Sequence, residues 1–315
     1  MRIHTSICDI FGIDYPIIQG AMAYIAGGRL AAAVSEAGGM GTIGSGNSPA
    51  SWLQEEIRIA REITDKNFAV NLVLTSPYLQ ENLEVVLREK IPVVTTGAGN
   101  PGPFMATFKE AGIKVVPVVA AVALAKRLER LGADALVVEG MESGGHVGEM
   151  TTMCIVPMVV DEVSIPVIAA GGIADGRGVA AAFALGAKGA QLGTRFICSE
   201  EANVHTAYQE KVIKTRDRGT VICGSTTGHP VRAIQNAFTR EYLKAENSGA
   251  DQETLMRLGT GRYPLAVVQG DIEQGSIMAG QISGLVKKIQ PAAEIIHEIM
   301  AEAIEILHKL GGMPC

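Results

Sequence analysis

Along most of the chain, the hydrophobic pattern alternates between an amphipathic-helix period and short, continuous apolar runs. Four stretches show this unit most clearly: residues 33–44, 108–119, 127–140 and 181–194. In each, the helical pattern ends at a glycine, which can stop a helix in the left-handed conformation. The Val- and Ile-rich run that follows is too short to be a helix. The pattern therefore predicts a repeated helix–strand unit.

Extending this reading to the whole chain predicts eight strands. They span residues 13–22, 40–44, 68–74, 93–96, 114–119, 135–139, 166–170 and 190–196. Helical patterns lie between them, for example at 51–63 and 78–89. Such alternation implies parallel strands with right-handed crossovers, and eight such strands close into a barrel. The predicted fold class is α/β, a (β/α)₈ TIM barrel, with a doubly wound open sheet as the alternative.

The helix–strand rhythm stops after residue 198. Residues 199–275 are more polar, carry the motifs TTGHPVRAIQN and VVQGDIEQGS, and predict an inserted helical cap or substrate subdomain after the eighth strand. Residues 276–315 are expected to pack back on the barrel. They include an amphipathic helix over 291–310 that ends where Gly311 and Gly312 interrupt it. The expected organisation is thus a barrel over 1–198, a cap and C-terminal helices.

Composition and charge narrow the class of protein. Of the 315 residues, 47% are hydrophobic and 19% charged, which suits strands buried on both faces. The net charge of −6 and the lack of Lys/Arg runs argue against a nucleic-acid partner. The sequence has no secretory h-region and no apolar stretch long enough to span a bilayer, so we expect a cytoplasmic protein without a membrane partner.

Metal and disulfide chemistry find no support in the sequence. The five cysteines, Cys8, Cys154, Cys198, Cys223 and Cys315, are widely spaced and form no CxxC pair. Neither HxH nor HExxH spacing occurs among the histidines. We expect reduced thiols and no metal site.

Glycine-rich loops follow the seventh and eighth predicted strands, as AGGIADGRG and QLGTRF. Glycines such as Gly171, Gly172 and Gly193 expose backbone amides, and the following helix adds the positive end of its dipole. Phosphate-binding barrels hold the phosphate at this place. The two loops therefore predict an anion cradle, although tight turns alone could also explain the glycines.

Other strand ends offer further candidates. Glycine-rich segments follow the first, second and fourth strands (19–22, 44–47 and 96–102), and Asn71 interrupts the apolar third strand. A buried Asn71 must be hydrogen-bonded, either in an internal network or to a polar ring system at the barrel mouth. No segment matches a Walker A loop, so ATP hydrolysis lacks support, and we do not expect Rossmann-type binding.

Two histidines lie in loops where catalysis is plausible. His146 follows the sixth strand within EGMESGGHVG, and His229 lies in TTGHP. An imidazole at the catalytic face can give or take a proton near neutral pH, but either residue could be an ordinary loop histidine. His205, His297 and His308 fall on predicted helices and are expected to be solvated.

Taken in order, these motifs resemble the nitronate monooxygenase (2-nitropropane dioxygenase) family, and more narrowly its FMN-dependent enoyl-acyl carrier protein reductase II branch. The resemblance covers nearly the whole chain. It is carried by DYPIIQGAM, AGGMGTIGSGN, FAVN, VVTTGAGNP, VVPVV, ALAKRLERLGADAL, EGMESGGHVG, IPVIAAGGIADG, QLGTRF, GHPVRAIQN and GSIMAGQISGLV.

The resemblance implies FMN as cofactor and assigns roles to individual residues. His146 falls on the family's catalytic histidine. The residues implied to bind the cofactor are Gly20, Ala21, Met22, Asn71, Glu139, Gly145, Ala170, Gly171, Gly172, Gln191, Gly193, Thr194, Met278, Gly280 and Gln281. Within this set, the first three pack against the flavin ring and Asn71 hydrogen-bonds it. Ala120 and Ala121 stand where a Pro-Ser pair often occurs, and residues 245–262 depart most from the branch.

The implied reaction is the reduction of 2-enoyl thioesters, free or bound to acyl carrier protein, in fatty acid synthesis with NADH or NADPH as co-substrate. A homodimer is the assembly that the family suggests. The main alternative is a nitronate monooxygenase that oxidises alkyl nitronates with oxygen. An IMP dehydrogenase type of barrel would need a nucleophilic cysteine such as Cys154, and a flavin-storage or phosphate-ligand binding protein is the non-enzymatic alternative.

Overall fold

Eight parallel strands form the centre of the molecule, which a computed structural model describes for residues 3–311. Their order is β1-β9-β8-β6-β5-β4-β3-β2. Their bounds are β1 Ile17–Gln19, β2 Thr42–Gly44, β3 Ala69–Val73, β4 Val93–Gly97, β5 Lys114–Val119, β6 Leu136–Glu139, β8 Val167–Ala170 and β9 Gly189–Leu192. Every predicted strand overlaps one of these eight. Gly312 and Cys315 lie outside the described residues.

The sheet closes between its two ends, β1 and β2. Ile18 and Met40 form a parallel bridge. The Met40 amide donates to the Ile17 carbonyl and the Gln19 amide to the Met40 carbonyl, both at 2.9 Å. Closure confirms the predicted barrel and shows that the open-sheet alternative is wrong.

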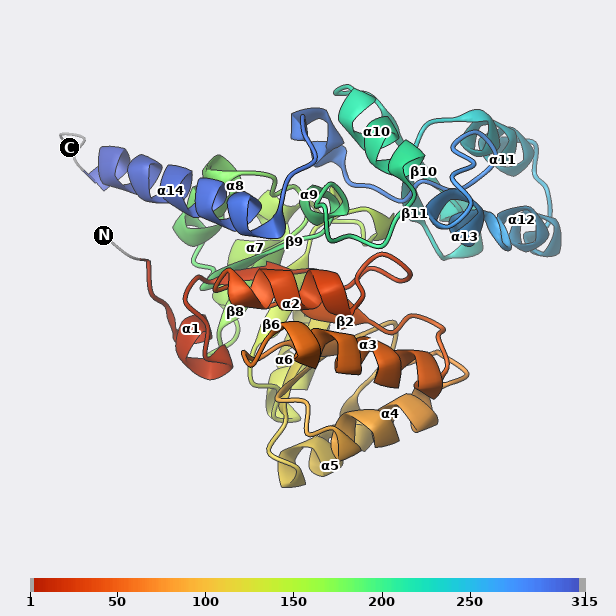
Figure 1. Cartoon of the computed structure of the whole chain (residues 1–315). Helices are drawn as coiled ribbons and strands as arrows, with labels where there is room; N and C mark the ends of the chain where they lie inside the picture. Colours follow the sequence, from red (N-terminus) through yellow and green to blue (C-terminus); the bar gives the residue numbers. More distant parts are fainter. Residues whose placement is uncertain (1–2, 312–315) are drawn as a thin grey trace.

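Helices cover the outside of the barrel (Figure 1). The barrel's own helices are α1 Ser6–Phe11, α2 Gly28–Glu36, α3 Ala50–Ile63, α4 Leu79–Arg88, α5 Met105–Glu110, α6 Val122–Arg130, α7 Thr152–Val160, α8 Gly176–Ala184 and α9 Thr194–Ile197, with the short 3-10 helix η1 Gly102–Phe104. Helix α3 illustrates why they pack: Leu53, Ile57 and Ala60 recur at helical spacing and are buried.

The amino-terminal end of the barrel is closed by α1. Ile7 and Phe11 of this helix are buried against Ile18, Val137 and Ile168, which point into the barrel from three strands. Because the barrel interior at this end is filled with apolar side chains, a ligand could enter the barrel only from the opposite end, where the strands end.

Residues 199–275, here called the cap segment, lie beside that opposite end (Figure 1). The segment contains α10 Thr206–Lys214, β10 Thr220–Cys223, η2 Ser225–Thr227, β11 Val231–Ile234, α11 Ala237–Asn247, α12 Gln252–Gly259 and α13 Arg262–Val267. The helices agree with the expectation of a helical cap, but the strands were not predicted. They form an antiparallel sheet, β10-β11-β7, whose third strand is β7 Gly145–His146 from the loop after β6.

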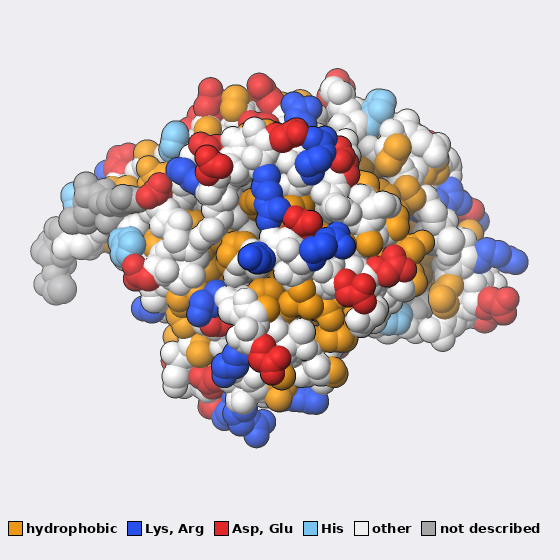
Figure 2. All heavy atoms as spheres, turned by 60° about the horizontal axis from the view of Figure 1, so that its bottom comes forward, with side chains coloured by type: hydrophobic (Ala, Val, Ile, Leu, Met, Phe, Trp, Pro, Cys, Tyr) orange, Lys and Arg blue, Asp and Glu red, His pale blue; other side chains and the backbone are white. Residues whose placement is uncertain are grey.

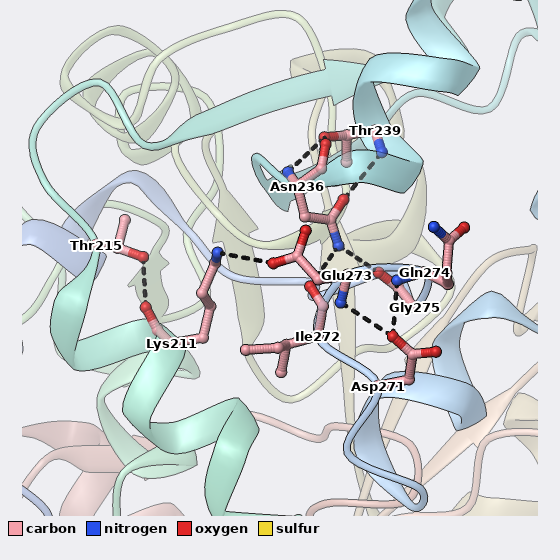
Figure 3. A network of polar contacts seen from close by, with 9 residues as sticks. All are labelled: Lys211, Thr215, Asn236, Thr239, Asp271, Ile272, Glu273, Gln274 and Gly275. Atoms are coloured by element: carbon pink, nitrogen blue, oxygen red, sulfur yellow. Dashed lines mark hydrogen bonds and ion pairs between the residues drawn. The ribbon is translucent and has the colours of Figure 1, made fainter.

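A buried polar network ties the cap segment together (Figure 3). Asn236 accepts from the Thr239 amide, while Thr239 Oγ1 accepts from the Asn236 amide, so the pair caps α11. The Asn236 side-chain amide also donates to the carbonyls of Ile272 (2.9 Å) and Gly275 (2.7 Å). The network therefore fixes α11 relative to the chain that leads into residues 276–281.

The chain then turns through η3 Gln281–Leu285 into α14 Ala292–Gly311, which lies beside α8 and α2 (Figure 1). The helices approach closely at Gly176, where a Cβ would lie 2.4 Å from the Ala303 amide nitrogen. Helix α14 includes Gly311, so the prediction that this glycine ends the helix is wrong by one residue.

The surface of the molecule carries both charged and apolar areas. Charged side chains of both signs are interspersed around an apolar area on the face drawn in Figure 2. No helix within residues 3–311 has the length and apolar character needed to cross a bilayer.

Candidate active site

Neighbouring strands place a ring of inward-facing residues at the carboxyl end of the barrel. Strand side chains alternate between faces, so Glu139 and Ala170 face inward because Val137 and Ile168, two positions earlier, belong to the interior cluster. Register pairs Glu139 with Ala170, and Ala170 with Gln191. The ring continues at Asn71, which follows the interior residue Ala69 by two positions. Four residues predicted from the sequence are thus brought to one face.

Asn71 takes the first of the two roles considered for it, as part of an internal hydrogen-bond network. Its side-chain amide donates to Thr95 Oγ1 at 2.9 Å, across a pair of residues in register on β3 and β4. The side chain is nevertheless only half-buried. Asn71 is therefore held by the internal network, and its contact with a ring system at the barrel mouth stays a prediction.

Glu139 has an unusual environment for a carboxyl group. Burial raises its pKa to about 7, and the neighbouring Ser143 hydroxyl partly offsets that effect. At neutral pH a substantial fraction of Glu139 is protonated and can donate a hydrogen bond. A protonated carboxylic acid at the ring suits contact with a polar, electron-rich ligand.

The loop after β1 closes one side of the ring. The Gly20 amide donates to the Leu192 carbonyl at 2.9 Å, and a Cβ on Gly20 would lie 3.3 Å from the Gln191 side chain. Met22 reaches the loop after β9, because the closest atom to a Cβ on Gly193 would be Met22 Sδ at 3.9 Å. Gly20, Ala21 and Met22 therefore lie beside the predicted phosphate loop.

The glycines in the loops after β8 and β9 differ in how closely the protein packs against them. Gly171 and Gly172 both adopt positive φ, of 89° and 72°. A Cβ on Gly171 would lie 2.7 Å from the Gly140 carbonyl oxygen, so this position requires glycine. Gly193 instead faces space, which leaves room for a ligand to approach the main chain.

Residues 278–281 cross over these loops. The Gly280 amide donates to Thr194 Oγ1 at 2.8 Å, and the Gln281 amide donates to the Glu142 carbonyl at 2.9 Å. A Cβ on Gly145 would lie 3.8 Å from Met278 Sδ. This segment, which contains the implied cofactor-binding residues Met278, Gly280 and Gln281, thus joins the loops after β6 and β9. The Thr194 hydroxyl accepts a hydrogen bond from within the protein.

His146 lies in strand β7, not in the irregular loop expected from the sequence. It pairs directly with Val231, and Gly145 pairs with Arg232. Burial lowers the pKa of His146, and the nearby His229 lowers it further. The two histidines chosen from the sequence are therefore close enough to influence each other, and at neutral pH the His146 ring is neutral.

Arg232 is a site residue that the sequence reasoning missed. Its side chain is 4% exposed. Nε and Nη2 donate to the Met141 carbonyl at 3.0 and 2.9 Å, and Nη1 donates to Thr220 Oγ1 at 3.2 Å. Burial lowers its pKa while Glu142 opposes that effect. Arg232 thereby fastens the His146 loop to the cap sheet. The signal that could have found it is the alternation in VRAI, which is typical of a strand.

The remaining candidates lie elsewhere. His205 caps α10 by accepting from the Ala207 amide, and His205, His297 and His308 are exposed as expected. Cys8, Cys154, Cys198 and Cys223 carry free thiols, with Cys154 exposed on α7. No cluster of three metal-ligating side chains occurs within residues 3–311.

The barrel and the polar site at its carboxyl end are those of a TIM-barrel enzyme. Comparison with known proteins shows the family to which it belongs. The nitronate monooxygenase family model matches residues 4–82 and 77–302, so the chain belongs to this family. FabK from Thermotoga maritima is 48% identical, with a TM-score of 0.95 and 98% and 99% of the two chains covered.

Curated relatives extend the comparison. A probable nitronate monooxygenase from Staphylococcus saprophyticus is 30% identical over 98% of this chain and 100% of its own. A (3aS,4S,5R,7aS)-5-hydroxy-7a-methyl-1-oxo-octahydro-1H-indene-4-carboxyl-CoA dehydrogenase from Rhodococcus jostii is 28% identical over 99% of each. These findings confirm the family resemblance and make the chain an oxidoreductase of an FMN-dependent family.

Proposed function

We propose that this chain uses FMN to reduce 2-enoyl thioesters, free or carried on acyl carrier protein, with NADH or NADPH as electron donor. Residues 1–198 form the FMN-binding barrel, 199–275 the cap over the substrate, and 276–315 the segment that packs back on the barrel. The observation that carries the proposal is the pairing of β7 with β11, because it fixes the His146 loop, which follows β6, at the carboxyl end of the barrel.

The residues present fit the flavin. The small residues Gly20 and Ala170 would leave room for the flavin ring system. Asn71, Glu139 and Gln191 would offer hydrogen-bonding groups to it. Ser45, at the end of β2, has a buried hydroxyl without a protein partner. Gly171, Gly172 and Gly193 would hold the phosphate, with the backbone at Gly193 open to it. When bound, FMN supplies hydride-transfer chemistry.

The protein's own contribution centres on His146. A neutral imidazole keeps one N–H, which can donate to the thioester carbonyl and stabilise the enolate-like charge that develops there. Supplying the proton that the α-carbon requires would instead take the protonated imidazolium form of His146. The loops after β6 and β9 are joined by residues 278–281, which helps to hold this donor in place.

Two of the similar proteins support a thioester as the substrate. The Thermotoga maritima FabK structure is nearly half identical to this chain over its whole length. The Rhodococcus jostii relative is named for a carboxyl-CoA substrate, which is also a thioester.

Nitronate oxidation is the second candidate. It is favoured by the family model and by the Staphylococcus saprophyticus relative. A monooxygenase would consume oxygen with alkyl nitronates and need no nicotinamide. A reductase would bleach its flavin with NADH or NADPH in the absence of oxygen and then reduce crotonyl thioester.

The deciding experiment separates the two half-reactions under anaerobic conditions. In His146→Ala, reduction of the flavin by NADH should stay within a few-fold of wild type, whereas reduction of crotonyl thioester should fall by about 10²–10⁴-fold. His308→Ala, exposed on α14, is the matched control. If enoyl reduction survives within a few-fold in His146→Ala, the assigned role is wrong. A colourless protein that takes up no FMN would refute the proposal altogether.

A further inference from the structure

The loop after β9, which would hold the FMN phosphate, continues directly into α9. The amides of Phe196 and Ile197 in this helix donate to the Gly193 carbonyl at 2.8 and 3.3 Å. Helix α9 spans only the four residues Thr194–Ile197, and a single helical turn is not stable by itself. The position of the Gly193 backbone therefore depends on the contacts that hold α9 against the rest of the protein.

Arg195 makes one such contact from within α9. Its side chain is 8% exposed, and Nη2 donates to the side-chain carbonyl of Gln290 at 2.5 Å. Gln290 is 3% exposed and lies two positions before Ala292, where α14 begins. This buried hydrogen bond joins α9 to the start of α14 across 95 positions of the chain.

The backbone of Gln290 is fixed on both sides. Its amide donates to the Cys198 carbonyl at 3.2 Å, and its carbonyl accepts from the Glu200 amide at 3.2 Å. The Glu201 carboxylate also accepts from the Ala292 amide at 3.0 and 3.2 Å. Gln290 is thus a fixed point between α14 and the chain that follows α9, and Arg195 can anchor α9 to it.

Arg195 forms no ion pair with any residue between 3 and 311. Glu298 of α14, the carboxylate that it affects, instead pairs with Lys288 at 2.7 Å. The pKa of Glu298 is lowered first by Lys288, and also by the Gln290 amide and by the charge of Arg195. The guanidinium of Arg195 is therefore held by a neutral partner, with its nearest opposing charge beyond that partner.

This arrangement is costly for a buried cation. Arg195 Nη1 and Gln290 Nε2 are both buried without a hydrogen-bond partner in the part of the chain that the structure describes. Burial lowers the pKa of Arg195, while Cys198 and Glu298 oppose that effect. A buried charge and an unpaired donor both cost free energy. Since proteins break such rules mainly at functional sites, we looked for a role of Arg195 in the neighbouring loop.

We propose that Arg195 is a positioning residue for FMN, which keeps Gly193 and Thr194 in the conformation that binds the phosphate by anchoring α9 to Gln290. Its side chain is directed at Gln290, so it acts through the backbone of α9 and not by touching the cofactor. The inference rests on the FMN binding of the proposed function, but it is independent of whether the flavin reduces enoyl thioesters or oxidises nitronates.

The test compares FMN with riboflavin, which has the same ring system and lacks the phosphate. Both are titrated into the flavin-free full-length chain, and binding is followed by flavin fluorescence. In Arg195→Met the Kd for FMN should rise about 10- to 100-fold, because a hydrogen bond from a charged group is lost. The Kd for riboflavin should change by less than about twofold, since the ring site is separate. Arg127→Met, exposed on α6, is the control and should change neither constant.

Variants of the partner show whether the hydrogen bond itself is responsible. Gln290→Leu removes the acceptor and should weaken FMN binding to a similar degree. Gln290→Glu keeps an acceptor for Nη2 and should stay within a few-fold of wild type. The double variant Arg195→Met/Gln290→Leu should bind FMN no more weakly than Arg195→Met alone, because both changes remove the same bond.

The inference is overturned if Arg195→Met weakens FMN and riboflavin equally, if it leaves the Kd for FMN within twofold of wild type, or if the losses add in the double variant. Melting temperatures of the flavin-free variants are measured alongside. If Arg195→Met does not fold, Gln290→Leu provides the same comparison of the two flavins. Loss of folding in both variants assigns the pair to stability and also overturns the inference.

The same measurements separate this inference from the proposed reaction. A wild type that binds FMN through Arg195 but reduces no enoyl thioester rejects the reductase and supports the positioning role. A wild type that reduces enoyl thioesters, together with an Arg195→Met variant that binds FMN normally, rejects the positioning role alone.

Discussion

Replacing Arg232 with methionine tests whether the cap sheet positions the catalytic loop. The change keeps an unbranched side chain of similar reach but removes three hydrogen bonds, two of them to the Met141 carbonyl. A buried acceptor left without its donor costs about 1–3 kcal/mol. If this free energy destabilises the conformation in which the loop holds His146 in place, kcat/KM for enoyl reduction should fall about 5- to 150-fold.

The assay compares kcat/KM for crotonyl thioester, the rate of flavin reduction by NADH, and the melting temperature. A positioning role lowers enoyl reduction far more than flavin reduction, whereas a purely structural role lowers the melting temperature and the flavin content together. Arg232→Lys, which can still reach one acceptor, should recover part of the activity. Arg240→Met, exposed on α11, is the matched control. Enoyl reduction within twofold of wild type in Arg232→Met would refute the reasoning.

Three further substitutions test other parts of the site. Because the pKa of Glu139 rises from 4.5 unfolded to about 7 folded, the folded state binds more protons between these values. Stability of the flavin-free protein should therefore fall by up to about 3 kcal/mol as pH rises through them; Glu139→Gln should flatten this slope in denaturant titrations. His229→Gln removes a group that lowers the pKa of His146, so the acidic limb of the pH–rate profile should move to higher pH; an unchanged limb would contradict the coupling. Asn236→Ala should lower the free energy of unfolding by about 2–4 kcal/mol, because three buried hydrogen bonds are lost; a loss below 1 kcal/mol would contradict this reading.

The barrel could be predicted because its determinants are local. Each unit carries a helical stripe, a glycine stop and a β-branched run within about 15 residues, and these signals need no knowledge of distant contacts. Strands β5 and β8, for example, match the predicted runs to within one residue. The ring of site residues could also be predicted from the strands, because strand alternation and barrel closure bring Asn71, Glu139 and Gln191 to one end.

The cap sheet was missed because its determinants are not local. Strand β7 has two residues, and its partner β11 lies about 85 positions later in the chain. No hydrophobic period can be read from two residues, and the glycines around His146 are typical of a loop. The role of Arg232 depends on the same distant pairing, so a motif containing VRAI gives its strand character but not its contacts.

His146 is held between the barrel and the cap segment. Its loop is anchored to the barrel, where the Glu142 carboxylate accepts from the Thr152 amide and hydroxyl, and to the cap segment, where Arg232 holds Met141. Strand β11 of the cap and strand β7, which carries His146, are consequently neighbours in one sheet. A substitution that shifts β11 should therefore also shift β7, and with it His146.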